Sequence, residues 1–179
     1  MYRSVRLAFC SLSAAVSVVL MFLTGAIPIG TYAIPALAAL PQLAVVIEFG
    51  TGWSWPVYAA VSLLSFFLAG DKEALLWYVL FFGCYPAVKS ALERKSRKPV
   101  SAFLKLVFFN AAAIAEFCLA MWLLNVPESS YSIFGVCLPW LFLVAGNIVF
   151  AVYDYALSLL AAAYFRKVHP RVAKWLKPR

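Results

Sequence analysis

Long apolar runs, separated by short polar or glycine- and proline-containing segments, occupy nearly the whole chain. A helix needs roughly 20 apolar residues to cross the hydrocarbon core of a bilayer, and inside lipid its backbone polar groups must be satisfied internally. The pattern therefore predicts an all-α, polytopic integral membrane protein, a six-helix bundle that forms a single domain over residues 1–179. The predicted helices cover residues 7–23, 31–49, 56–69, 74–92, 103–124 and 139–165.

Proline and glycine positions predict where two of these helices depart from straight geometry. The second run contains Pro35 and Pro41, and the fourth contains Gly83 and Pro86. Because proline cannot donate a backbone hydrogen bond and crowds the preceding turn, we expect the second helix to be kinked or broken and the fourth to bend. A broken helix at membrane depth is tolerated where it packs in protein or lines a cavity.

The connections carry residues typical of turns and helix caps. Residues 50–55 are predicted to form a turn whose tryptophans lie at the membrane interface. Pro56 then suits the first turn of the third helix. Asp71 is in position to cap the fourth helix, and the polar segment 125–132 is predicted to be another turn.

The first apolar run allows two interpretations. Arg3 and Arg6 precede it, which is also the arrangement of a cleaved signal peptide. Because further apolar runs follow, we favour a retained first helix. Either interpretation leaves the orientation of the other helices unchanged.

Composition agrees with the membrane class. Hydrophobic residues make up 65% of the chain and charged residues 12%, and the mean hydropathy is +0.92. Soluble globular domains carry about 25% charged residues. We therefore expect a multi-pass protein of the cell membrane with hardly any soluble part.

Charge placement predicts the orientation. The chain has 15 Lys and Arg against 7 Asp and Glu, a net charge of +8. Counted against six helices, every basic residue except Lys72 falls on one side, which the positive-inside rule makes cytoplasmic, so both termini are predicted to be cytoplasmic. We expect Lys89 to extend to the headgroups and the basic tail 166–179, which contains Trp175, to rest on anionic headgroups. Membrane orientation explains the charge better than a nucleic-acid partner does.

Enzyme and metal motifs are not found in the sequence. It contains no H-E-x-x-H, no G-x-S-x-G and no Walker lysine, so we predict neither an enzyme nor an ATP site. His169 is the only histidine, and it gives no zinc site. The cysteines lie in apolar runs without a C-x-x-C pair, so we predict small buried side chains and no metal or other cofactor. They are Cys10, Cys84, Cys118 and Cys137.

Two carboxylates within the predicted helices are the main candidates for chemistry, because a charge at mid-bilayer costs about 2.5–3.5 kcal/mol on insertion scales. Glu116 lies roughly 16 Å beyond Lys105, and Asp154 lies roughly 18 Å before Arg166, so both are expected near mid-membrane. With Asn110 and Asn147 they predict either a polar pocket for a small solute between helices five and six or an interhelical hydrogen-bond cluster. The residues alone leave both interpretations open.

Two further groups of residues are candidates for binding. Trp77 and Tyr78, with Trp122 and Trp140, are expected near the outer side as an aromatic belt or as a lid over a ligand. On the first helix a stripe of small residues would let another helix approach closely, either from the same chain or from a partner. The stripe consists of Ser4, Ala8, Ser11 and Ala15.

This plan resembles the substrate-binding (S) component of energy-coupling factor transporters. The resemblance covers the length, the six helices, the predicted cytoplasmic termini, the small-residue face and an irregular first outer loop. It extends to the stretch IEFGTGWSWPVYAAVSLLSFFLAGDKEALLWYVLFFGCYPAVKSALER. It implies a subunit that binds a vitamin or related micronutrient near the outer face and docks through helix one to a scaffold subunit driven by two ATPases. The alanine-x-x-x-alanine docking motif would fall on Ser11 and Ala15, with serine in place of one alanine.

Two other functions remain open. One is a membrane scaffold similar to the rod-shape protein of the bacterial elongation machinery, which needs surfaces but no pocket. The other is a stand-alone carrier in which Glu116 and Asp154 exchange protons. No vitamin-specific signature is present, so the solute is not predicted.

Overall fold

The computed structural model describes residues 2–26, 30–124, 132–133, 136–137 and 139–176, and its long elements are all helices. The all-α prediction is confirmed. A two-residue antiparallel pair, β1 (Ser132–Ile133) and β2 (Val136–Cys137), is the small exception among these residues. The helices are α1 (Tyr2–Leu23), α2 (Gly30–Ala38), α3 (Leu40–Phe49), α4 (Thr51–Leu68), α5 (Lys72–Trp77), the π-helical η1 (Tyr78–Phe82), α6 (Tyr85–Lys95), α7 (Lys98–Leu124), α8 (Pro139–Lys167) and α9 (His169–Leu176).

Five stretches of the described chain are helices long and apolar enough to cross a membrane. The third predicted span is not among them, because the first part of α4 holds Trp53, Ser54, Trp55 and Pro56. Many large apolar side chains point away from the protein, such as Leu12 at 66% exposed, Phe67 at 74% and Ile148 at 65%. Such a surface suits lipid and not water. The chain therefore has the helices and the surface of a membrane-embedded protein.

The second predicted helix is broken, as its prolines indicated. α2 ends at Ala38, and α3 begins at Leu40 with Pro41 in its first turn, where a missing N–H costs little. Gln42 of α3 is buried, and its Nε2 donates to the backbone oxygen and to the Oγ of Ser54, both at 2.6 Å. After the break, the polar side chain of Gln42 therefore packs against α4.

The fourth predicted helix is interrupted by a π-helical segment. η1 joins α5 to α6, and the N–H of Gly83 reaches back to the carbonyl of Tyr78 at 2.8 Å. A Cβ on Gly83 would lie 2.7 Å from the Tyr78 ring and 2.9 Å from the Tyr58 ring. The absence of a side chain at this position lets the two tyrosine rings stack, and Pro86 then opens α6.

The predicted turn over residues 50–55 is wrong. Only Gly50, with φ of 81°, separates α3 from α4, which is already helical at Thr51. Pro56 accordingly lies inside α4 and not in its first turn. Ser54 is fully buried and accepts from Gln42, so packing against α3 keeps this aromatic segment helical.

Asp71 caps the fourth helix as predicted. Its Oδ1 accepts from the N–H groups of Glu73 at 2.9 Å and Ala74 at 3.2 Å. Its Oδ2 accepts from Thr31 Oγ1 at 2.8 Å, and Tyr32 donates to Glu73 Oε1 at 3.1 Å. One capping residue therefore also ties the start of α5 to the start of α2.

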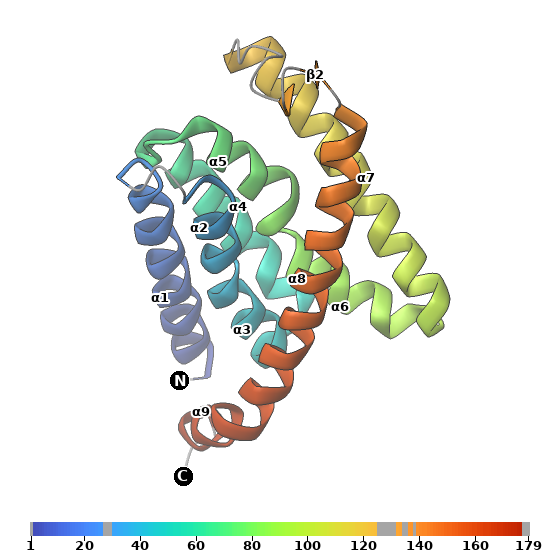
Figure 1. Cartoon of the computed structure of the whole chain (residues 1–179). Coiled ribbons are helices and arrows are strands. Elements are labelled where there is room, and N and C mark those ends of the chain that lie inside the picture. The colour runs from blue at the N-terminus through green and yellow to red at the C-terminus, as the bar shows by residue number, and fades with distance from the viewer. Residues whose placement is uncertain (1, 27–29, 125–131, 134–135, 138, 177–179) are drawn as a thin grey trace.

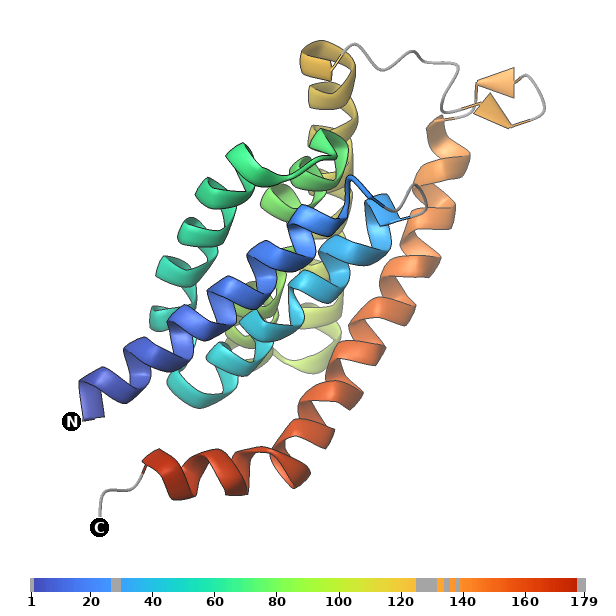
Figure 2. The same cartoon turned by 90° about the vertical axis from the view of Figure 1, so that its left-hand side faces the viewer.

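The helices form a bundle of α1 to α6 with α7 and α8 packed on one side (Figures 1 and 2). Both termini lie at the same end, and at the opposite end the turn after α1 meets the turn before α5. There a Cβ on Gly70 would lie 2.7 Å from Gly25 Cα, so two backbones touch. Two buried clusters fill the interior, one centred on α1 and α4 and one on α7 and α8, and both include residues of α3 and η1.

Helix ends differ modestly from the prediction. α1 starts at Tyr2, the fourth span extends to Lys95, α7 starts at Lys98 and α8 extends to Lys167. Part of the basic tail forms α9, which turns away from α8 and runs beneath the end of the bundle that holds the N-terminus (Figure 2). The predicted polar turn at 125–132 lies outside the described residues, apart from Ser132 of β1.

Candidate functional site

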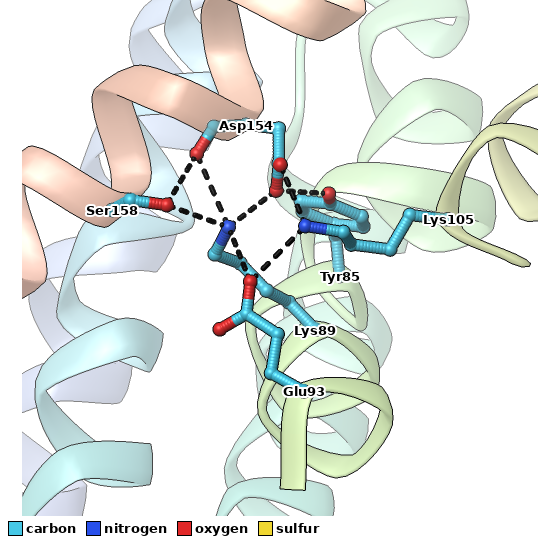
Figure 3. A network of polar contacts seen from close by, with 6 residues as sticks. All are labelled: Tyr85, Lys89, Glu93, Lys105, Asp154 and Ser158. Atoms are coloured by element: carbon cyan, nitrogen blue, oxygen red, sulfur yellow. Dashed lines mark hydrogen bonds and ion pairs between the residues drawn. The ribbon is translucent and has the colours of Figure 1, made fainter. Parts of the chain in front are cut away.

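Charged and hydroxyl side chains from α6, α7 and α8 meet in one network (Figure 3). It is partly buried, since Tyr85, Lys89 and Lys105 are buried, Asp154 is half-buried, and the other members are exposed. On α6 the contributing positions are four residues apart, and so are those on α8, so each set lies on one helical face. α6 contributes Tyr85, Lys89 and Glu93, α7 contributes Lys105, and α8 contributes Asp154 and Ser158.

Asp154 is the central acceptor. Its Oδ1 accepts from the ammonium of Lys89 and from the hydroxyl of Tyr85, the latter at 2.6 Å. Its Oδ2 accepts from Lys105 Nζ at 2.6 Å. One carboxylate on α8 therefore binds side chains of both neighbouring helices.

The two lysines are shared between two carboxylates. Lys89 Nζ also contacts Ser158 Oγ at 2.9 Å, the backbone oxygen of Asp154 at 3.1 Å and Glu93 Oε1 at 3.0 Å. Lys105 Nζ also donates to Glu93 Oε1 at 3.0 Å. Two ammonium groups and two carboxylates balance in charge, which offsets much of the cost of removing them from water.

We expected Lys89 to extend to the headgroups, and this prediction is wrong. It is 4% exposed and turns toward α8, and Lys105 is 7% exposed. The physical reason is Asp154, which offers both lysines a partner of opposite charge within side-chain reach. The signal available in the sequence was the presence of opposite charges inside three apolar runs, together with the i, i+4 spacing of Lys89 and Glu93.

A second polar contact joins the same helices. Asn110 Nδ2 donates to Asn147 Oδ1 at 2.8 Å, and Asn147 Nδ2 donates to Asn110 Oδ1 at 3.1 Å. Each amide also donates to a carbonyl of its own helix, that of Leu106 or Leu143, at 2.8 Å. The structure thus brings together these two predicted site residues, as a mutual pair between α7 and α8.

Glu116 stands apart from Asp154. Asp154 pairs with Lys105, and Glu116 follows Lys105 by 11 positions, roughly 16 Å further along α7, so the two carboxylates do not share one depth. The residue is 2% exposed, and its Oε1 has no hydrogen-bond partner among the described residues. α7 packs against α5 in this half of the molecule, near the end where Asp71 and Glu73 lie.

The predicted aromatic candidates occupy different surroundings. Trp77 is half-buried, meets the Tyr32 ring edge-on at 5.6 Å, and has an indole nitrogen without a partner in the described part of the chain. Tyr78 is fully buried and stacks with Tyr58 at 6.5 Å between ring centres. Trp122 is 78% exposed, and the side chain of Trp140 lies outside the described residues.

The small-residue stripe on α1 faces outward. Ser4, Ala8, Ser11 and Ala15 are all exposed, whereas other residues of α1 are buried, including Ser17, whose Oγ donates to the carbonyl of Ala38 at 2.8 Å. The stripe is thus not covered by any described part of this chain.

Cysteine and histidine form no metal site in the described ranges. Cys10 and Cys84 are buried as predicted, whereas Cys118 is exposed on α7, and the side chain of Cys137 is outside the described residues. No group of three or more potential metal ligands occurs within residues 2–26, 30–124 and the described part of 132–176. His169 does have a partner, since its Nδ1 lies 3.1 Å and 3.2 Å from the oxygens of the buried Glu48.

Comparison of the chain with protein-family models, with curated proteins and with solved structures yields no match.

Proposed function

We propose that this chain is the solute-binding membrane subunit of a small-nutrient importer of the energy-coupling factor type. In this proposal six helices cross the cell membrane, both termini are cytoplasmic, and separate scaffold and ATPase subunits supply the energy. A vitamin or related micronutrient is the class of solute. Glu116 is the main contact of the solute, and Trp77 lies beside the path by which the solute enters.

The observation that carries the proposal is the buried carboxyl oxygen Oε1 of Glu116, which lies in an apolar helix and has no partner among the described residues. Buried polar atoms in proteins are almost always hydrogen-bonded, and ionisable residues inside membranes generally mark a pathway or a ligand. A solute that donates to Glu116 Oε1 would supply the missing partner. Asp71 and Glu73 at the same end of the bundle favour a solute with a positive or hydrogen-bond-donating group.

The exposed small-residue stripe supports the docking part of the proposal. A scaffold subunit that packs on α1 needs a face on which a second helix can approach closely, and small side chains allow this approach. Ser11 and Ala15 lie on that exposed face. The ATPases would then act on this chain through the scaffold.

A membrane scaffold of the rod-shape type is the second candidate. The observation in its favour is that Asn110, Asn147 and Asp154 have protein partners, which is what interhelical joints in a rigid scaffold require. A stand-alone proton-coupled carrier has less support, because Glu116 and Asp154 lie far apart along the helices.

Native mass spectrometry of the purified protein separates these functions. We expect a bound small molecule in the wild type, its loss in Glu116→Gln, and its retention in Cys118→Ser, an exposed change two residues along the same helix. Scaffold and ATPase subunits should co-purify. An empty protein that brings down only wall-synthesis partners would contradict the importer, and uptake by this chain alone under a proton gradient would indicate the carrier.

A further inference from the structure

A hollow opens at the turn between α6 and α7, away from the position of Glu116. It has a volume of about 350 Å³, and Glu93, Ser96, Lys98, Ser101 and Lys105 line it. The turn is the common end of two apolar spans, Lys72–Lys95 and Lys98–Leu123. The hollow therefore lies where the hydrocarbon core gives way to headgroups and water.

Two buried side chains of the hollow have hydrogen-bonding capacity to spare. Ser101 is 3% exposed, and its Oγ has no partner in the part of the chain that the structure describes. Lys105 Nζ carries three donors, of which Asp154 and Glu93 take two. A ligand with several acceptor oxygens would satisfy both groups at once.

The charge around the hollow favours an anion. Arg94, Lys95, Arg97 and Lys98 surround the turn and are exposed, and Lys98 lines the hollow itself. Ser101 stands in the first turn of the 27-residue helix α7, whose N-terminal dipole also attracts negative charge. Glu93 opposes an anion, but its Oε1 already contacts both Lys89 and Lys105.

We infer that this hollow binds a phosphate group, either the headgroup of an anionic phospholipid or a soluble phosphate. The phosphate oxygens accept from Ser101 Oγ, from the third N–H of Lys105 and from Lys98 at the mouth. Basic pockets between membrane helices at the headgroup level are known to hold anionic headgroups. The site is separate from the proposed solute site and does not depend on it.

Native mass spectrometry of the delipidated protein tests the inference. Phosphatidylglycerol should bind more tightly than diacylglycerol of the same chains, which lacks the phosphate. Ser101→Ala and Lys98→Gln should each weaken phosphatidylglycerol binding by about tenfold or more, the effect of losing a hydrogen bond to a charged group. Lys98 is exposed, so Lys98→Gln should leave folding unchanged. It therefore still tests the site if the buried change Ser101→Ala impairs folding.

Arg94→Gln is the matched control, since Arg94 is an exposed base on the same turn that does not line the hollow. It should change binding by less than about twofold. Millimolar inorganic phosphate that displaces the lipid would identify a free phosphate as a sufficient ligand, whereas no displacement would identify the lipid headgroup. Equal binding of both lipids, or equal weakening by Arg94→Gln and Lys98→Gln, would overturn the site.

Discussion

Asp154 shows how much one side chain can organise in a membrane protein. Its two carboxylate oxygens receive donors from Tyr85, Lys89 and Lys105, which belong to two other helices. In a low-dielectric interior such contacts are strong when complete, and a charge left without its partner is costly. Two lysines share two carboxylates in this network, so removing one carboxylate leaves buried positive charge with less compensation.

Replacing Asp154 by Asn should therefore lower the free energy of unfolding by about 3 kcal/mol, because among the described residues Lys89 and Lys105 would be left with Glu93 alone as a carboxylate partner. Ser158→Ala, which removes a neutral partner of Lys89, should cost about 1 kcal/mol. Denaturation of the detergent-solubilised protein, followed by tryptophan fluorescence, measures both. If the two variants unfold alike, charge balance does not hold the network together.

At the scale of elements, the short helix α9 is attached to the bundle by a contact between distant residues. His169 opens α9 and lies beside Glu48, which is 121 residues away in sequence at the end of α3. The Glu48 side chain is 1% exposed and that of His169 is 42% exposed. The contact places the basic tail beneath the bundle, where the sequence predicts that it meets anionic headgroups.

His169→Ala should loosen α9 without affecting the rest of the bundle. Loss of the Glu48 contact should raise amide hydrogen exchange in the peptide 168–176 by roughly fivefold, the equivalent of about 1 kcal/mol. His169→Gln retains a side-chain donor for Glu48 and should restore part of the protection. Exchange measured by mass spectrometry that is equal in wild type and His169→Ala would show that α9 is held by other contacts.

For the whole molecule, the apolar surface and the placement of the ends favour a membrane-embedded bundle. Helices α1, α4, α7 and α8 present large apolar side chains outward, and both termini lie at one end (Figure 1). An even number of crossings is consistent with that placement, and α4 supplies the sixth crossing in our proposal. The orientation in the cell rests on the positive-inside rule.

Cysteine labelling tests this topology. In a background with the four native cysteines replaced by alanine, we introduce Lys72→Cys or Arg97→Cys, both at exposed positions. A membrane-impermeant maleimide should label Lys72→Cys in intact cells, and Arg97→Cys only after permeabilisation. The reverse result would invert the orientation, and labelling of both from outside would contradict the placement of the two turns on opposite sides.

Features that depend on local chemistry could be predicted from the sequence. Apolar runs imply helices because lipid leaves the backbone no other partner, Asp71 caps a helix because its carboxylate reaches N–H groups two and three residues on, and Pro41 breaks a helix because it lacks an N–H. The Asn110–Asn147 contact also follows the predicted approach of helices five and six. Each of these depends on few neighbours.

The tertiary structure alone decided which charges meet. Asp154 pairs with Lys89 and Lys105 across 65 and 49 residues of sequence. Glu116, which was expected beside Asp154, lies elsewhere, and its Oε1 has no partner in the part of the chain that the structure describes. Counting residues gives depth along one helix, but pairing also depends on the rotation of each helix about its axis, on its tilt and on its register against its neighbours. Those quantities arise from packing of whole helices, and no single run of the sequence contains them.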